Sequence, residues 1–388
     1  MRRASLIVLA MSSAACSGDG PGQRAPNRWI RPITQIAPEF TERVGAFSAI
    51  DVLGCTIVAA DWMERRLWVL RNGVASITPL GRAGDGPGEF RHVRAVAIAA
   101  DSLTTALDWG RRRLIQYRWD GTLETDVALS GGVLNHASVG PLRALPDGRF
   151  VDYWLADFVT GRYIPTDVLE ILPLVAILRA DGTLTTDGWG SPDKPADPEA
   201  LHLRMLLQSG DAAVVGDSLF VLRNVTGSVE VYSLAVPGRR PVRKMELRRF
   251  REWIDPYEEG SEAYQTPWGV NARGGRIYLE NSTLAFDIDT AGRSYVVTRM
   301  SSRYDEAGVP WAAELLAVYS RAGEELAMFR LPTRNTRQVR LARDGSVLLL
   351  AHADAHPKSG MHIVILPPVM EASDAPPCEW VGTDTYGP

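Results

Sequence analysis

Short segments of this sequence recur at a spacing in the forties. Asp61–Leu67 (DWMERRL) returns 47 positions later as Asp108–Leu114 (DWGRRRL). A β run, a turn and a second β run recur in Gln116–Leu123, Ile177–Leu184 and Val318–Glu324. Few stretches show the 3.6-residue apolar period of a helix. A period in the forties with four strands per unit is typical of β-propeller blades, so we predict an all-β propeller.

Glycine-containing pairs mark the turns between these strands. They include Asn72-Gly73, Asp120-Gly121, Asp181-Gly182 and Asp344-Gly345, which accept the backbone angles of tight hairpins. They divide the chain into six units of antiparallel strands at 46–80, 93–129, 142–187, 212–247, 283–331 and 337–366. The last unit has three clear strands, and we expect the segment 29–36 to supply its fourth strand and close the ring. A hairpin at 270–280 fits no unit and leaves seven blades as the alternative.

The order of strands in a propeller separates two faces. The short glycine turns fall on one face, and the long connections 81–92, 155–172, 188–211, 248–267, 300–314 and 352–360 fall on the other. Binding residues concentrate in long loops on a rigid scaffold. We therefore expect a plain face and a loop-rich face, and we expect function on the second.

The segment Gly84–Phe90 (GDGPGEF), with Gly81 before it, resembles the inter-blade linker of bacterial six-bladed, NHL-like β-propeller proteins. The resemblance covers roughly residues 46–366, and the motif occurs once. Many proteins of that type are exported lipoproteins. The resemblance implies the fold and no particular activity, because propellers host unrelated functions.

The first residues resemble an export signal. Arg2 and Arg3 precede an apolar run, and Ser13-Ala14-Ala15-Cys16 resembles a bacterial lipobox, with Cys16 as the lipidated residue. This predicts a signal peptide over 1–16, a tether with the ring-closing strand over 17–45, the propeller over 46–370 and a C-terminal tail over 371–388. We expect an outer-membrane or periplasmic lipoprotein of a bacterium, attached to the membrane through its lipid alone. Cleavage near Ala15 and plain secretion is the alternative.

Two further cysteines, Cys55 and Cys378, stand at the two ends of the propeller. In an exported protein they either form a disulfide that ties the start of the fold to its end, or remain as two unrelated buried thiols.

The charge balance bears on the class of partner. Lysine and arginine number 42 and aspartate and glutamate 46, for a formal net charge of −4. No basic excess is present to bind a phosphate backbone, so we expect no nucleic-acid partner. We expect a monomer that binds a glycan, a peptide or an envelope protein.

Aromatic side chains beside acidic ones are the candidate ligand-binding residues. Asp61-Trp62 and Asp108-Trp109 open equivalent turns, and an indole beside a carboxylate suits a carbohydrate. The competing interpretation is structural, with the aspartates accepting bonds from turn N–H groups. Long connections contribute the remaining candidates, which are Trp189, Trp253, Tyr257 and Trp311.

His352, Asp354 and His356 alternate along one segment, and residues two apart on a strand share a face. Such side chains can bind Zn²⁺, and acidic residues can bind Ca²⁺. A solvated loop explains the same segment, and we expect no cofactor.

The sequence therefore favours a binding or scaffold module over an enzyme. It lacks the Gly-x-Ser-x-Gly and His-Glu-x-x-His patterns and a phosphate-binding loop. The alternative is a metal-dependent hydrolase resembling the six-bladed lactonases and strictosidine-synthase-like propellers.

Overall fold

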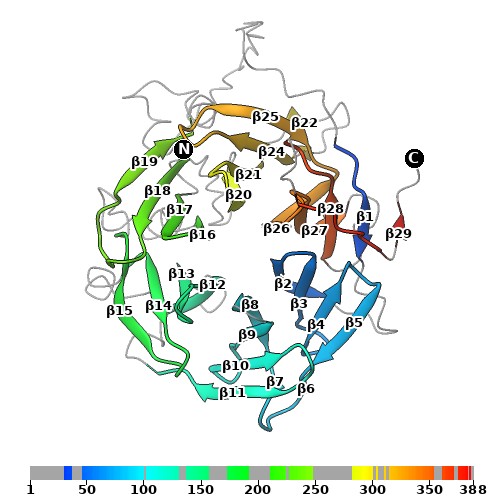
Figure 1. The fold of residues 1–388 in the computed structure, drawn as a ribbon, viewed down its shortest axis with the longest axis vertical. Coiled ribbons are helices and arrows are strands. Elements are labelled where there is room, and N and C mark those ends of the chain that lie inside the picture. The colour runs from blue at the N-terminus through cyan, green and yellow to red at the C-terminus, as the bar shows by residue number, and fades with distance from the viewer. Residues whose placement is uncertain are drawn as a thin grey trace, which may run out of the picture.

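Figure 1 shows strands grouped into blades around a central axis. This computed structural model describes residues 30–36, 46–99, 102–130, 137–156, 173–191, 210–223, 227–247, 282–299, 303–304, 310–311, 314–353, 361–370, 375–382 and 384–385. In these ranges every regular element is a β-strand, and six sheets form the blades. The prediction of an all-β, six-bladed propeller is confirmed. No helix capable of crossing a membrane occurs among these residues.

Four blades are built from consecutive strands that run from the axis outward. Blade 1 consists of β2 (Phe47–Leu53), β3 (Thr56–Asp61), β4 (Arg66–Arg71) and β5 (Ser76–Leu80). Blade 2 consists of β8 (Val93–Ala99), β9 (Leu103–Asp108), β10 (Arg113–Arg118) and β11 (Leu123–Ala128). Blade 3 consists of β12 (Ala137–Ala144), β13 (Phe150–Ala156), β14 (Val175–Leu178) and β15 (Leu184–Trp189). Blade 4 consists of β16 (Gly210–Val215), β17 (Ser218–Arg223), β18 (Ser228–Ser233) and β19 (Arg243–Glu246).

The other two blades depart from this simple order. Blade 5 consists of β20 (Ser282–Ile288), β21 (Ser294–Arg299), β24 (Glu314–Tyr319) and β25 (Glu325–Arg330). A small pair, β22 (Arg303–Tyr304) with β23 (Pro310–Trp311), lies in its middle connection. Blade 6 consists of β26 (Thr333–Leu341), β27 (Val347–Ala353), β28 (His362–Leu366), β1 (Thr34–Ile36) and β29 (Asp384–Thr385). A parallel pair, β6 (Arg82–Ala83) with β7 (Glu89–Phe90), links blades 1 and 2. The hairpin expected at 270–280 lies outside the described residues.

Blade 6 is completed from both ends of the chain. β1 pairs antiparallel with β28 as the fourth strand, as the segment 29–36 was expected to do, and β29 pairs with β1 beyond it (Figure 1). A disulfide joins Cys55 to Cys378, across 323 residues of sequence. Val381 exchanges backbone hydrogen bonds with the segment 72–74 of blade 1. The chain ends therefore cover what would otherwise be an open strand edge.

The apolar core lies between neighbouring blades. Six buried clusters occur, and each takes side chains from two adjacent sheets. Ala49 and Leu67 of blade 1, for example, pack with Val96 and Ile115 of blade 2. Because each sheet buries both of its faces this way, its strands are apolar on both sides. This explains the near-continuous apolar runs of strands such as β24, in which every residue is buried.

Candidate functional site

The turn between β3 and β4 is organised by one buried carboxylate. Asp61 is fully buried, and its Oδ1 accepts hydrogen bonds from the backbone N–H groups of Ala46 (3.2 Å), Met63 (3.0 Å) and Glu64 (3.0 Å). Its Oδ2 accepts one from the indole N–H of Trp68 at 3.4 Å. A carboxylate with four internal donors has little capacity left for a ligand. Asp61 therefore shapes the turn, and the carbohydrate-binding role expected of it does not fit its burial.

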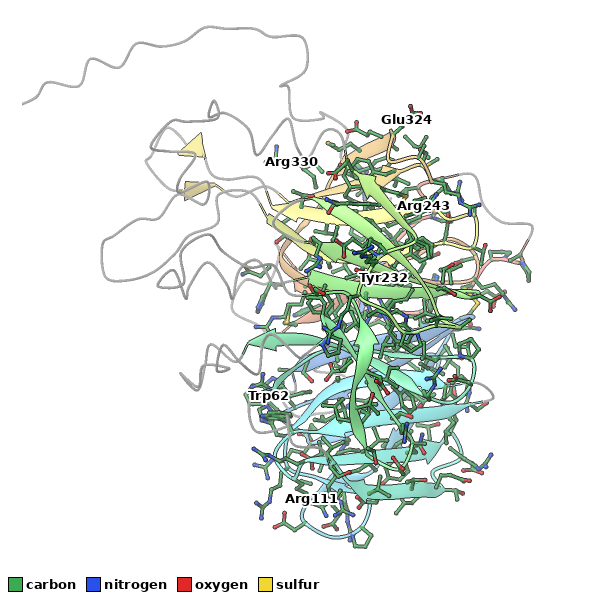
Figure 2. The ribbon with its side chains drawn as sticks, turned by 90° about the vertical axis from the view of Figure 1, so that its left-hand side faces the viewer. Trp62, Arg111, Tyr232, Arg243, Glu324 and Arg330 are labelled. Atoms are coloured by element: carbon green, nitrogen blue, oxygen red, sulfur yellow. A yellow bond between two sulfur atoms is a disulfide. The ribbon has the colours of Figure 1, made fainter. Side chains whose placement is uncertain are left out.

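The same turn presents two large apolar side chains to solvent. Trp62 is 46% exposed and Met63 is 48% exposed. The indole of Trp62 lies 6.4 Å from the imidazole of His92, centroid to centroid, with the rings tilted by 52°. In Figure 2, where the disc is seen from the side, Trp62 lies toward one of its two faces, on the same side as Arg111. These side chains belong to the face that carries the 81–92 connection, because Trp109 N–H, in the adjoining turn, donates to His92 O.

The environment of His92 disfavours its charged form. Burial lowers the pKa of His92 most, and Arg94 and Arg65 lower it further, while Asp108 opposes them. Arg65 is exposed and Arg94 is half-buried. Neither has an ion-pair partner within the part of the chain that the structure describes. We call Trp62, Met63, Arg65, His92 and Arg94 the Trp62 corner.

The GDGPGEF linker serves the scaffold beside this corner. Phe90 is buried, and a Cβ on Gly81, whose φ is +68°, would collide with the Phe90 ring. Glu89 Oε2 accepts the Gly86 N–H at 2.6 Å, and the Tyr117 hydroxyl donates to Gly88 O. Glycine is required where the ring approaches the backbone so closely. The linker is thus explained by local packing.

The repeat of the Asp-Trp motif in blade 2 uses its aspartate in the same way. Asp108 is fully buried and accepts the backbone N–H groups of Arg91 (2.9 Å), His92 (2.9 Å) and Arg111 (3.3 Å). Trp109 is half-buried and packs against the core cluster between blades 2 and 3. The Arg112 guanidinium lies 6.0 Å from its ring centroid. Asp108 is a structural residue, and Trp109 is mainly a packing residue.

The other expected site residues are not brought together in one place. Trp189 is fully buried, and its indole N–H donates to Ser233 O at 2.9 Å, so it packs inside the protein and does not face a ligand. Trp311 pairs with Arg303 through the backbone of β23 and β22. Trp253, Tyr257, Asp354, His356 and Cys16 lie outside the described residues. His352 lies in β27 opposite Arg334. Among the described residues, no group of three histidine, cysteine or acidic side chains could hold a metal.

The axis of the propeller is crossed by a buried ionic cluster that the sequence analysis did not identify. It comes from innermost strands and consists of Asp51, Arg143, Asp211, Asp287 and Arg340. Arg340 Nε donates to Asp51 Oδ1 at 3.2 Å, and the Arg143 guanidinium lies 3.7 Å from Asp51 and 3.6 Å from Asp287. Burial raises the pKa of Asp211 and of Asp287, against the opposing effect of Arg143.

Carboxylates of this cluster also bind the backbone of the next inner strand. Asp51 accepts Ile98 N–H at 2.8 Å, Asp211 accepts Phe286 N–H at 3.0 Å, and Asp287 accepts Leu341 N–H at 3.0 Å. The cluster therefore ties blades together at the axis. The signal for it was a charged residue close to the first hairpin turn of several units, such as Asp51, Arg143 and Arg340.

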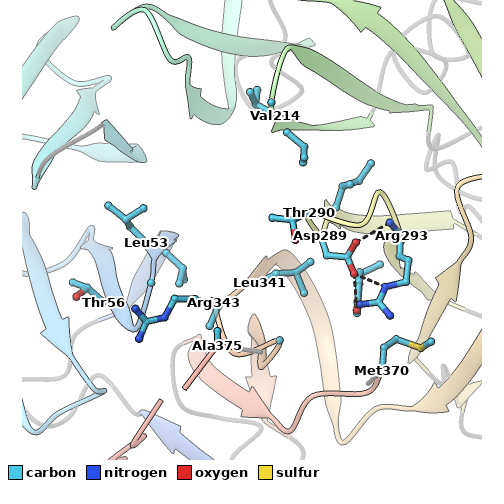
Figure 3. A pocket seen from close by; sticks show the side chains of 18 of the residues that line it. Leu53, Thr56, Val214, Asp289, Thr290, Arg293, Leu341, Arg343, Met370 and Ala375 are labelled. Atoms are coloured by element: carbon cyan, nitrogen blue, oxygen red, sulfur yellow. Dashed lines mark hydrogen bonds and ion pairs between the residues drawn. The ribbon is translucent and has the colours of Figure 1, made fainter. Parts of the chain in front are cut away.

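A cavity of about 1000 Å³ opens on the face opposite the Trp62 corner. Its mouth is ringed by the first hairpin turn of several blades. Figure 3 shows Leu53, Val214 and Leu341 around this space. Asp289 accepts bonds from Arg293 Nε at 2.5 Å and from the Tyr295 hydroxyl at 3.3 Å. The acidic group in this wall is thus already engaged by its own turn.

Comparison with known proteins adds a likeness of fold. No protein-family model matches the chain, and no curated protein sequence matches it. A luciferin-regenerating enzyme has 11% identity and a TM-score of 0.49, over 90% of this chain and 99% of that one. The calcium-binding protein regucalcin from Agrobacterium tumefaciens has 12% identity and a TM-score of 0.46, over 88% and 97%. A member of the duf4221 family from Bacteroides vulgatus has 10% identity and a TM-score of 0.48, over 89% and 96%. At these identities the likeness gives the protein no activity and no ligand.

Proposed function

We propose that this protein is an exported, envelope-attached binding module that takes a glycan, peptide or protein partner on its loop-rich face. The observation that carries the proposal is the Trp62 corner. A tryptophan and a methionine, each close to half exposed, stand side by side on a turn held rigidly by Asp61. Exposed aromatic side chains on rigid elements are typical anchors of binding surfaces.

The proposal gives the propeller the role of a rigid support. Interlocking blades and the axial ionic cluster hold the turns in place, so the corner is formed before a partner arrives. A preformed surface loses little conformational freedom on binding. The anchor at Cys16 would hold the module at the membrane, and the tether would let the loop-rich face reach its partner.

The test is a binding screen with a matched variant. Wild type and the double variant Trp62→Ala/Met63→Ser are compared by biolayer interferometry on immobilised neutral polysaccharides, acidic polysaccharides, and acidic and basic polypeptides. We expect at least one probe to bind the wild type and to lose most of that binding in the variant. Binding that the variant retains in full, or no binding to any probe, would contradict the proposal.

The metal-dependent hydrolase is the alternative reading, and the described channel residues do not fit its metal. The carboxylates of Asp51, Asp211 and Asp287 already accept backbone N–H groups. The guanidinium groups of Arg143 and Arg340 lie beside Asp51. A divalent cation there would stand next to two guanidinium groups. Metal analysis of purified protein, before and after chelation, tests this point: a near-stoichiometric ion whose removal changes the fold would restore the hydrolase.

A further inference from the structure

The exposed indole of the Trp62 corner has an unused hydrogen-bond donor, whereas several other tryptophans use theirs. The indole N–H groups of Trp68, Trp119 and Trp380 donate to Asp61, Thr104 and Ser346 respectively. Trp62 Nε1 has no acceptor among the described residues. Its ring therefore offers a flat apolar face and a free N–H donor together. A sugar ring, with an apolar C–H face and hydroxyl acceptors, matches this combination.

Some of the guanidinium groups near the corner form ion pairs or hydrogen bonds within the protein, and others do not. Arg91 is paired with Asp85, and Arg82 Nε is 2.7 Å from Glu89 Oε1. Arg111 donates to Gly86 O at 2.8 Å and to Glu89 O. Neither Arg65 nor Arg94 forms an ion pair among the described residues, although Arg65 also lowers the pKa of Asp85 from a distance. Arg65 belongs to the same turn as Trp62, Arg94 lies two residues after His92 in β8, and both lower the pKa of His92. Two unpaired guanidinium groups beside an exposed ring favour an anionic ligand.

Most backbone N–H groups around the corner already have acceptors within the protein. The N–H groups of Met63 and Glu64 bind Asp61, and those of Arg91 and His92 bind Asp108. The backbone N–H of Trp62 donates to Ala46 O at 3.1 Å, and the backbone N–H of Trp109 donates to His92 O at 2.9 Å. A peptide that adds a strand needs free backbone groups at an edge. With these N–H groups engaged, the surface offers a ligand mainly its side chains, which favours a sugar over an extended peptide.

We propose that the Trp62 corner binds an acidic polysaccharide, with a sugar ring stacked on Trp62 and its carboxylates paired with Arg65 and Arg94. The inference rests on the proposed function and adds the chemical class of the partner. Carboxylates on a uronic acid polymer recur along the chain, so one molecule can engage both guanidinium groups while presenting a ring face to the indole. Charge pairing at an exposed surface also makes the interaction sensitive to salt.

The test uses three probes that separate charge from shape. Polygalacturonate supplies sugar rings and carboxylates, its methyl ester keeps the rings without the charge, and poly-L-glutamate keeps the charge without the rings. We expect wild type to bind polygalacturonate at low salt at least tenfold more tightly than either of the others. Raising the salt from 20 mM to 300 mM should weaken that binding about tenfold or more.

Variants assign the binding to the corner. Trp62→Ala should lose at least tenfold in affinity, Trp62→Phe should recover part of it, and Arg65→Ala/Arg94→Ala should lose both affinity and salt dependence. Arg118→Ala is the matched control, because Arg118 is an exposed arginine paired with Glu124 at a turn of the plain face. A thermal melt of each variant verifies the fold.

The outcomes separate this inference from the function beneath it. Trp62-dependent binding to the methyl ester or to poly-L-glutamate at equal strength would overturn the acidic polysaccharide and leave the binding face intact. Equal binding of polygalacturonate by wild type and Trp62→Ala would overturn the inference. If no probe in the screen shows binding that depends on Trp62, both this inference and the proposed function are overturned.

Discussion

Two turns of this propeller share a sequence motif and a backbone conformation, yet they differ in how far they expose their tryptophan. In both, a fully buried aspartate accepts the turn N–H groups, and an arginine adopts a positive φ, at 53° for Arg65 and 51° for Arg112. In the first turn the tryptophan is 46% exposed. In the second turn Trp109 packs against the core between blades 2 and 3. The shared part of the motif is thus structural, and the candidate function lies where the two copies differ.

One position next to the tryptophan also differs between the two turns. Met63 of the first turn corresponds to Gly110 of the second. A Cβ on Gly110 would stand 2.8 Å from the Arg91 Cβ and 3.1 Å from the His92 Cβ. The second turn is therefore pressed against the 81–92 connection, whereas the first turn leaves its methionine in solvent. The first turn therefore presents an exposed side chain at a position where the second turn has no room for one.

The largest expected effect is on stability, and it tests the buried aspartate that the two turns share. Asp61→Ala and Asp108→Ala should each lower the free energy of unfolding by about 4 kcal/mol, because each leaves buried N–H groups without an acceptor. Urea denaturation measures the loss. A loss in one turn only would break the structural equivalence of the two aspartates, and retention of full stability in both would contradict their role.

The tryptophans should then separate the two turns. Trp109→Ala should lower the free energy of unfolding by about 2 kcal/mol, because it removes a side chain packed against a core cluster. Trp62→Ala should change it by less than about 0.5 kcal/mol, as expected for an exposed position. The same denaturation experiment makes the comparison, and equal losses would show that Trp62 is a packing residue as well.

Exchange at the glycine position sharpens the contrast. Gly110→Met should destabilise the protein by about 2 kcal/mol, because the new side chain has no room beside Arg91 and His92. Met63→Gly is the reverse exchange and should cost less, since Met63 contributes exposed surface. Thermal melts of the two variants provide the measurement. Tolerance of methionine at position 110 would remove the steric explanation for the difference.

The smallest expected effect is the pH dependence that His92 gives to stability and to anion binding. Because the pKa of His92 is lowered by burial, Arg94 and Arg65, with Asp108 opposing, the folded state binds its proton less readily than the unfolded state does. The stability that neutral His92 provides is present above about pH 6.5 and declines as the pH falls below that value. An anion at the corner favours the charged imidazole, so its affinity should rise about threefold between pH 7.5 and 5.5.

His92→Asn is the control for this titration. The variant should bind the same anion with an affinity that no longer changes over this pH range. An unchanged pH dependence in His92→Asn would assign the titration to another group.

The sequence predicts the blades better than the site. The six units came within a few residues of the observed sheets, because the glycine turns and the period in the forties depend on local chemistry. The fourth strand of blade 6 was predictable because a ring must close. The disulfide was one of two alternatives, since spacing in the sequence does not give the distance between Cys55 and Cys378 in space.

The candidate site depended on contacts that the sequence does not display. The Asp61-Trp62 pair suggests a carboxylate beside an indole, yet the carboxylate turns inward and the indole outward. The residues that supply the charge, Arg65 and Arg94, both act on His92 only because a turn of blade 1 approaches the start of the first strand of blade 2. The Met63 and Gly110 difference was visible in the sequence, but its meaning depends on the position of the 81–92 connection.

The most direct test follows the indole N–H groups while an acidic sugar is added. The chain has 11 tryptophans, and ¹⁵N labelling of their side chains gives one resonance for each ordered indole. The Trp62 resonance is assigned as the one missing from Trp62→Phe, and the Trp109 resonance as the one missing from Trp109→Phe. Titration with trigalacturonate should move the Trp62 resonance in a saturable way and leave that of Trp109 in place. A stationary Trp62 resonance, while others move or none does, would contradict a binding face at the Trp62 corner.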